Sequence, residues 1–324
     1  MEKLNLSFAC GPYDRMDPLA KKEVEPQGIN LNYITIQNPR EIFDRMINDR
    51  QFDASEMSVS EYICRYADGE RDLVGIPVFP SRAFRHSCIV VNTDMIKTPS
   101  DLNGKKIGVQ IYTMTAAVWI RGVLQEAGVD LSTITWVEGD LRKPGSHGRP
   151  RAKRLLRPVN RVRSESSSSL SQLLETGEIA ATIGADVPTC FGKTPHIQHL
   201  FPNVRQTEKE YFQRTGIFPI MHLVVIKKDV LERHPFVASS LFKAMNESKD
   251  IALAQMKFAS TYRYMLPFLP SDLKEIEDIF GGDPWPYGVE PNRKVLESLV
   301  TFLYDQAMIA RKVPLEELFP IACE

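Results

Sequence analysis

Residues 98–109 read Thr98-Pro99-Ser100-Asp101-Leu102-Asn103-Gly104-Lys105-Lys106-Ile107-Gly108-Val109. This pattern predicts a linker and a short helix that lead into a new strand. Farther along, the sequence predicts a helix that ends at Gly128, a strand at 134–137, a helix at 170–174 and a strand at 179–183. Alternation of strands and helices is typical of a parallel α/β unit, so we expect one in the middle of the chain.

The segments on either side of this middle block predict a second α/β unit. Strands are expected at 4–9, 29–36, 52–54, 73–79, 87–91 and 221–226, and helices from Pro39 and over 229–259. The predicted fold class is therefore α/β with two lobes, and the second lobe (95–218) is inserted into the first (1–94 plus 219–324). Because ligands of such folds bind at the carboxyl ends of strands, we expect a ligand cleft between the lobes.

Length and composition indicate a soluble globular protein. The 324 residues are 43% hydrophobic and 25% charged, with a formal net charge of -1. No apolar run approaches the ~20 residues that span a bilayer, and residues 1–10 lack the apolar core of a secretory signal. The five cysteines form no CxxC pair, which excludes metal-finger spacing and argues against a disulfide framework. We therefore expect a cytoplasmic protein without a membrane partner.

The near-neutral charge conceals a basic strip within the loop 141–169. Nine basic residues and no acidic one lie from Leu141 to Ser164, which leaves a formal charge of -10 on the other 300 residues. The strip lacks aromatic interleaving and any nucleic-acid-binding motif, so we expect no nucleic-acid partner. Its prolines and serines are instead typical of a solvated, disordered loop.

Five strings of residues carry a resemblance to a known family. They are Phe52-Asp53-Ala54-Ser55-Glu56-Met57-Ser58, Gly75-Ile76-Pro77-Val78-Phe79-Pro80-Ser81-Arg82, Phe84-Arg85-His86-Ser87, Asp101-Leu102-Asn103-Gly104-Lys105-Lys106-Ile107-Gly108-Val109 and Lys143-Pro144-Gly145-Ser146-His147-Gly148. Together with the general layout they resemble the 4,5-dihydroxyphthalate decarboxylase family, which is similar in fold to type II periplasmic solute-binding proteins. The resemblance covers nearly the whole chain except 149–169. A local shift of reading frame would produce such a departure, a hypothesis that resequencing can refute, so we take no site residue from this stretch.

The resemblance implies an enzyme of phthalate degradation. It would be a carboxy-lyase that converts 4,5-dihydroxyphthalate into 3,4-dihydroxybenzoate and CO2 without oxidation, and its partner would be this small aromatic dicarboxylate. The alternative is a solute-binding protein or sensor for an aromatic dicarboxylate. Because a receptor must be exported, the missing signal favours the enzyme. A third option is a related enzyme that uses the same fold on another substrate.

Loss of CO2 from an electron-rich ring requires cations that hold the carboxylates and an acid that protonates the ring carbon. We expect Arg82 and Arg85 to grip the ortho-dicarboxylate, because a guanidinium binds a carboxylate at two points. Their alternative is a role as solvated strand-end charges or in an ion pair with Asp14 or Glu56. His86 is the expected proton donor, since histidine titrates near neutral pH. Glu56 is expected to orient His86 or to act as the acid, and His147 to close over the cleft from a flexible turn.

Six further side chains at strand–helix turns are expected to contact the substrate. They are Tyr13, Arg15, Ser58, Thr113, Thr115 and Asp186. Most have an ordinary structural alternative, because the hydroxyls can cap helices and Asp186 can terminate its strand. His147 can equally lie in a surface loop without function. His222 reads as a satisfied core histidine rather than a site residue.

No cofactor is expected, and metal ligands stay unknown. His196 and His199 lie three residues apart, but Pro195 argues against a helix that would present both to one ion. No HExxH or His-x-His pattern occurs. A divalent ion that bridges catechol oxygens remains possible chemistry without support from ligand spacing. A homo-oligomer stays open, and no helix face in the sequence identifies its interface.

Overall fold

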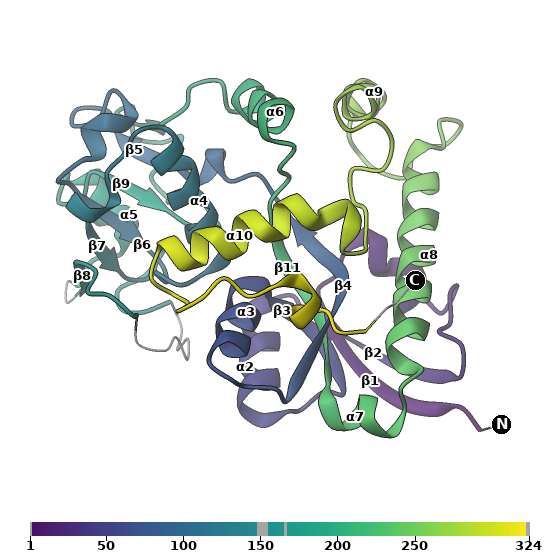
Figure 1. Cartoon of the computed structure of the whole chain (residues 1–324). Coiled ribbons are helices and arrows are strands. Elements are labelled where there is room, and N and C mark those ends of the chain that lie inside the picture. Colours follow the sequence, from purple (N-terminus) through teal and green to yellow (C-terminus); the bar gives the residue numbers. More distant parts are fainter. Residues whose placement is uncertain (1, 148–154, 165–166, 322–324) are drawn as a thin grey trace. The chain divides into compact units, whose positions relative to one another are not determined.

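The computed structural model describes residues 2–147, 155–164 and 167–321. The chain divides into two compact units. Unit 1 comprises Met1–Arg82, Ile220–Leu296 and Val313–Glu324, and unit 2 comprises Ala83–Pro219 and Glu297–Lys312. Each unit contains one β-sheet and its own helices (Figure 1), as expected for an α/β protein with an inserted second lobe.

Five strands form the sheet of unit 1. They are β1 (Leu4–Cys10), β2 (Ile29–Thr35), β3 (Ala54–Ser58), β4 (Leu73–Arg82) and β11 (Ile220–Lys227). Their order is β2-β1-β3-β11-β4, which places β3 at the centre. β1 is parallel to β2 and β3, whereas β11 runs antiparallel between β3 and β4. Every residue of β3 is buried, as its central position requires.

The helices of unit 1 follow from local sequence signals. They are α1 (Asp17–Ala20), α2 (Pro39–Asp49), α3 (Val59–Ala67), α7 (Lys228–Arg233), α8 (Val237–Lys257), α9 (Leu269–Phe280) and α11 (Leu315–Leu318). In α2, Asn38 accepts a hydrogen bond from the backbone N–H of Arg40 at 3.0 Å, and Pro39 occupies the first turn. The predicted apolar face of α2 is buried, and each such side chain contributes about 1.5–3 kcal/mol. It consists of Ile42, Phe43, Met46 and Ile47.

Six strands form the sheet of unit 2. They are β5 (Val90–Asn92), β6 (Lys106–Val109), β7 (Thr135–Glu138), β8 (Arg161–Arg163), β9 (Ala181–Ile183) and β10 (Ile197–His199), in the order β10-β5-β9-β6-β7-β8. β6 is parallel to β7 and β9, and β7 is parallel to β8. The helices are α4 (Thr115–Glu126), α5 (Leu170–Glu175) and α6 (Val204–Thr215), joined by the larger part of α10 (Arg293–Asp305). The alternation predicted for residues 98–183 is therefore present.

The division between the units differs from the expected lobe boundaries. Residues 83–94 belong to unit 2, because β5 pairs with β9 and β10. Residues 297–312 belong to unit 2 as well. There, Gln306 accepts a hydrogen bond from Nε of the fully buried Arg121 at 2.8 Å and donates one to the carbonyl oxygen of Val118 at 3.0 Å. These contacts join distant parts of the chain, so local composition does not reveal them.

Two predicted strands have different bounds in the structure. The strand expected at 52–54 is instead β3, which continues through Glu56 to Ser58. Glu56 can continue this strand because its buried carboxylate accepts hydrogen bonds from neighbouring segments. The strand expected at 87–91 is β5, which starts only at Val90, and His86–Cys88 form a 3-10 turn before it.

Part of the basic strip is ordered secondary structure rather than the expected disordered loop. β8 is the edge strand of unit 2, with Arg161 opposite Trp136 of β7. The approach to this strand is also anchored, because the carbonyl oxygen of Asn160 accepts from the N–H of Trp136 at 2.8 Å. The strip residues 148–154 and the neighbouring 165–166 lie outside the described residues. Across the described ranges, none of the helices has the length and apolar character needed to cross a bilayer.

Candidate active site

Glu56 is the centre of a buried polar cluster in unit 1. It lies in β3, and its side chain has no exposed surface. One carboxylate oxygen accepts hydrogen bonds from the Tyr13 hydroxyl and from Nδ1 of His222, each at 2.5 Å. The other oxygen accepts from the backbone N–H of Gly11 at 2.9 Å. The Cys10 thiol lies 3.5 Å from this second oxygen as well, so four donors from two other segments satisfy one buried charge, as a carboxylate at this depth requires.

The topology of the sheet explains why these groups meet. Gly11 and Tyr13 follow β1, which is the parallel neighbour of β3, so their turn lies near the carboxyl ends of both strands. On the other side of β3, the antiparallel strand β11 places His222 opposite Ser58. The cluster therefore lies at the end of the sheet where α/β folds bind their ligands.

The electrostatics of the cluster favour a charged Glu56 and a protonated Tyr13. Burial alone would raise the pKa of the Glu56 carboxyl. The charge of His222 and the hydrogen bonds from His222, Tyr13 and Gly11 nevertheless hold that pKa below its usual value. Burial, followed by the adjacent Glu56 carboxylate, raises the pKa of Tyr13 far above its usual range. Tyr13 therefore remains a hydrogen-bond donor, and Glu56 remains an acceptor for His222.

His222 has the geometry of an acid–base group, which the sequence analysis missed. A carboxylate only accepts, so the Nδ1 atom that faces Glu56 carries a hydrogen, and Nε2 is the nitrogen that can exchange a proton with a ligand. The His222 side chain is 17% exposed, whereas that of Glu56 is fully buried, so only the ring reaches the surface. Its edge-to-face contact with Phe43, with ring centroids 5.0 Å apart, fixes the ring further. The signal in the sequence was a histidine inside an otherwise apolar strand.

Arg15 is held rigidly beside the cluster. Its guanidinium carbon lies 4.4 Å from the ring centroid of Tyr13 and 4.2 Å from that of Trp285. Nε donates to the carbonyl oxygen of Pro80 at 2.6 Å, and Nη1 lies 3.0 Å from Oδ1 of Asp14. This fixed cation suits recognition of a carboxylate, because little conformational entropy is lost when it binds.

Arg82 and Arg85 have different surroundings from each other. Arg82 ends β4 in unit 1, is 6% exposed, and donates from Nη2 to Oδ1 of Asn292 at 2.5 Å. Asn292 in turn donates to the carbonyl oxygens of Pro286 and Gly288, so Arg82 braces this loop. Burial lowers the pKa of Arg82 to about 10, which leaves it charged at neutral pH. Arg85 belongs to unit 2 and donates from Nη1 to the carbonyl oxygen of residue 185 at 3.0 Å.

His86 lies in unit 2 between aromatic rings and the carboxylate of Glu208, whose Oε1 is 3.8 Å from its Nδ1. It is 3% exposed and makes edge-to-face contacts with the rings of Phe201 and Tyr211. Burial, with a smaller effect of Arg214, lowers the pKa of His86 to about 4. This environment favours the neutral ring, and the role of His86 as proton donor stays a prediction. Glu56, expected to orient His86, instead bonds to His222 within unit 1.

His147 forms a second polar cluster, at the carboxyl ends of β6 and β7. Its Nδ1 lies 3.1 Å from Oδ2 of Asp140 and 3.1 Å from Nε2 of Gln110. Asp140 also accepts from the backbone N–H groups of Arg142 and Lys143, and its pKa lies below the usual value because these donors and His147 outweigh the effect of burial. The turn at 140–147, which was expected to be flexible, is therefore held by hydrogen bonds to the carboxylate of Asp140.

The other predicted contacts occupy ordinary structural positions. Ser58 caps α3 and accepts from the N–H of Glu61. Thr113 lies in the turn before α4, and Thr115 is the buried first residue of that helix. Asp186 is exposed and pairs with Arg142. In all, unit 1 holds Tyr13, Arg15, Glu56, Ser58 and Arg82, and unit 2 holds Arg85, His86, Thr113, Thr115, His147 and Asp186.

The described residues offer no clear metal site. No group of three or more His, Cys, Asp or Glu side chains among them has the arrangement to hold an ion. His199 packs against the ring of Phe191 with centroids 4.3 Å apart, while Nε2 of His196 lies 3.3 Å from the carbonyl oxygen of Glu175. The spacing of these two histidines therefore does not reflect binding of a shared metal ion.

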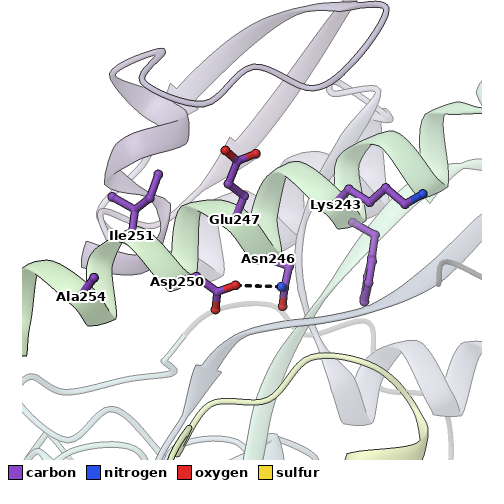
Figure 2. Close-up of a pocket in the computed structure, with 7 residues that line it drawn as sticks. Lys243, Asn246, Glu247, Asp250, Ile251 and Ala254 are labelled. Carbon is purple, nitrogen blue, oxygen red and sulfur yellow. Dashed lines mark hydrogen bonds between the residues drawn. The ribbon is translucent and has the colours of Figure 1, made fainter.

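A cavity of about 400 Å³ runs along one face of α8 (Figure 2). It is lined by Phe242, Lys243, Asn246, Glu247, Asp250, Ile251 and Ala254. Asn246 donates to the Asp250 carboxylate at 3.1 Å within this row. The lining comes from a single helix and includes none of the strand ends, so the Glu56 cluster remains the candidate active site.

Comparison with known proteins identifies the family. No family model matches the chain. A 4,5-dihydroxyphthalate decarboxylase of Comamonas testosteroni is 37% identical over 322 residues, which cover 98% of this chain and 97% of that protein. The chain belongs to the 4,5-dihydroxyphthalate decarboxylase family. A second member, from Pseudomonas putida, is 37% identical over 216 residues, or 66% of this chain and 83% of that protein.

Solved structures confirm the fold expected of the family. The periplasmic aliphatic sulphonate-binding protein SsuA of Escherichia coli matches with a TM-score of 0.53 and 13% identity, covering 97% of this chain and 91% of that one. A protein from Archaeoglobus fulgidus matches with a TM-score of 0.54 and 13% identity, covering 94% and 98%. This decarboxylase family member therefore has a periplasmic-binding-protein-like α/β fold.

Proposed function

We propose that this protein removes CO2 from 4,5-dihydroxyphthalate to give 3,4-dihydroxybenzoate, a step of phthalate degradation. The observation that carries the proposal is the pair of Glu56 and His222, found in a chain that is 37% identical to a decarboxylase over nearly its full length. The pair supplies a positioned proton donor, which decarboxylation of an aromatic ring requires.

The proposed reaction balances without a redox partner. In 4,5-dihydroxyphthalate each carboxylate has a hydroxyl para to it, and this hydroxyl pushes electrons toward the carbon that bears the carboxylate. His222 donates the proton on Nε2 to that carbon, and the carbon–carboxylate bond then breaks. The electrons of that bond restore the aromatic ring, CO2 leaves, and the neutral imidazole regains a proton from solvent.

Glu56 and Arg15 serve this step in different ways. The Glu56 carboxylate accepts a hydrogen bond from Nδ1 of His222 and so fixes the orientation of its ring. Arg15 holds a substrate carboxylate from its place between Tyr13 and Trp285. Direct substrate contacts by the remaining predicted residues, and a cytoplasmic location, stay predictions.

Incubation of the purified protein with 4,5-dihydroxyphthalate in D2O tests the proposal. We expect 3,4-dihydroxybenzoate that carries one deuterium at the vacated ring carbon, together with trapped CO2, as measured by chromatography and mass spectrometry. The control is the variant His222→Gln, which should release neither product at a comparable rate. Tight binding of the intact substrate without turnover would overturn the proposal and favour a solute-binding protein or sensor.

A further inference from the structure

Tyr287 is a buried residue of unit 1 whose hydroxyl group is unpaired. Tyr287 is 6% exposed, and its hydroxyl oxygen has no hydrogen-bond partner among the described residues. Buried hydroxyl groups nearly always have a partner, because an unpaired one has lost its hydrogen bonds to water without replacement. Such a group is explained when a bound ligand supplies the partner.

Two hydrogen bonds to β4 fix the segment that carries Tyr287. The N–H of Gly288 donates to the carbonyl oxygen of Pro77 at 2.8 Å, and indole Nε1 of Trp285 donates to that of Phe79 at 2.9 Å. Gly288 has a φ of 97°, in the region that favours glycine, so the turn after Tyr287 depends on this residue. The chain is therefore held on both sides of Tyr287.

Arg15 lies next to the same segment. Its Nε donates to the carbonyl oxygen of Pro80, in the same part of β4. The Ser248 hydroxyl in α8 donates to the carbonyl oxygen of Arg15 at 2.9 Å. Nζ of the adjacent Lys249 lies 5.5 Å from the centroid of the Tyr287 ring. β4 and α8 therefore bring Tyr287 and Arg15 into one neighbourhood of unit 1.

The charges around the Tyr287 hydroxyl favour an anionic ligand group. Burial raises the pKa of Tyr287 well above its usual value, so the hydroxyl stays protonated and can donate a hydrogen bond. The positive charge of Arg15 acts on this hydroxyl. The carboxylates of Asp14 and Asp283 also act on it, but each is already paired with a cation. A protonated donor beside a fixed guanidinium suits a carboxylate, which accepts hydrogen bonds from both.

We propose that Tyr287 binds the carboxylate that the substrate retains, as a second donor beside Arg15. The inference rests on the proposed function, and it gives different roles to the two equivalent carboxylates of 4,5-dihydroxyphthalate. One carboxylate accepts hydrogen bonds from Tyr287 and Arg15 and stays on the ring. This contact orients the ring so that the other carboxylate leaves from the carbon that His222 protonates. The product keeps the bound carboxylate, so it binds the free enzyme through the same two donors.

Isothermal titration calorimetry with 3,4-dihydroxybenzoate tests this contact without turnover. We expect Tyr287→Phe to raise the dissociation constant by ~10-fold or more, because a hydrogen bond to a charged group is lost. Catechol has the same ring and hydroxyls but no carboxylate. It should therefore bind more weakly than 3,4-dihydroxybenzoate, with equal dissociation constants in wild type and variant. Tyr304→Phe is the matched control, since Tyr304 is 42% exposed and belongs to unit 2.

Thermal unfolding separates a ligand-binding role from a structural one. The hydroxyl has no partner among the described residues of the ligand-free protein, so Tyr287→Phe should leave Tm unchanged or raise it. An equal concentration of 3,4-dihydroxybenzoate should then raise Tm less in the variant than in the wild type, because weaker binding stabilises the folded state less.

Three outcomes would contradict this role of Tyr287. Equal dissociation constants for 3,4-dihydroxybenzoate in wild type and Tyr287→Phe would exclude the contact. A Tm that falls by several degrees without ligand would show that the hydroxyl has a structural partner. A wild type that binds neither 4,5-dihydroxyphthalate nor 3,4-dihydroxybenzoate would overturn the proposed function itself, and the role of Tyr287 with it.

Discussion

Nδ1 of His222 lies 2.5 Å from Oε1 of Glu56, although the two residues are 166 positions apart in the chain. The contact forms because β11 runs antiparallel to β3 at the centre of the sheet of unit 1, which places His222 opposite Ser58, two residues beyond Glu56. It joins a fully buried carboxylate to an imidazole that is partly exposed. The Glu56 carboxylate thus fixes the imidazole through Nδ1, and Nε2 is the nitrogen that can exchange a proton with a ligand.

Replacement of His222 by Gln should lower kcat by a factor of about 10²–10⁴ with a smaller change in KM, because general acid catalysis contributes on this scale. Steady-state assays of product formation measure both constants. His196→Gln is the matched control, since the His196 ring lies in unit 2, with Nε2 3.3 Å from the carbonyl oxygen of Glu175, outside the Glu56 cluster. Loss of turnover in His86→Gln but not in His222→Gln would instead identify His86 as the proton donor.

Replacement of Glu56 by Gln should lower kcat by about 10–100-fold, because a neutral amide replaces the carboxylate that fixes the ring of His222. Steady-state assays of product formation measure the loss. An unchanged kcat in a folded variant would mean that Glu56 does not position His222.

The Glu56 carboxylate should also make folding sensitive to acid. Its pKa is lower in the folded protein than in the unfolded chain, so its contribution to stability is complete above the unfolded value of about 4.3 and is lost as pH falls through the folded value. Urea unfolding between pH 7 and pH 3 should show this loss in the wild type. Glu56→Gln should lack this component, even if it is less stable at pH 7.

His86 should make the folded protein lose stability on acidification at a higher pH than Glu56 does. Burial lowers its pKa to about 4, whereas an unfolded histidine titrates near 6.5. As pH falls from about 6.5 to 4, the unfolded chain gains a proton that the folded chain does not, which costs up to about 3 kcal/mol. Glu208, with its Oε1 3.8 Å from Nδ1 of His86, has a pKa raised by burial and offsets part of this loss. Thermal unfolding from pH 7.5 to 4.5 should therefore show a smaller decrease in Tm for His86→Gln than for the wild type.

Replacement of Arg15 by Gln should raise KM by ~10–100-fold with a smaller effect on kcat, because a carboxylate contact made in both ground and transition states is lost. The conservative Arg15→Lys should recover only part of the affinity, since an ammonium cannot bind at two points. Arg233→Gln, an exposed arginine paired with Asp229 on α7, serves as the control. Equal KM values for Arg15→Gln and this control would remove Arg15 from the substrate site.

The parts of the fold that the sequence predicts correctly depend on patterns within short, continuous stretches of residues. The face of α2 has helical spacing and a start signal at Pro39, so its burial followed from residues within one helix. The strands and helices over 98–183 were predicted for the same reason. β5 was assigned to the wrong lobe because its partners β9 and β10 lie about 90 or more residues later in the chain.

The candidate site was only partly predictable, because its chemistry depends on such distant pairs. Glu56 and Tyr13 are predicted site residues, but the sequence pairs Glu56 with His86 as one possibility. Its actual partner enters with β11, and only the order of strands in the sheet brings the two together. A buried glutamate indicates that a donor must exist, yet the sequence does not say which one.

The course of α10 has a consequence for biosynthesis. The chain passes from one unit to the other at residues 82, 219, 296 and 312, and α10 contains the third of these crossings. Neither unit is a continuous segment, and the sheet of unit 1 cannot form before β11 has emerged from the ribosome. All six strands of unit 2 lie within residues 83–219, so its sheet can form first, but each unit is completed only by residues that follow α9. A chain that stops before α10 lacks part of both units, so a C-terminal truncation there would leave neither one intact.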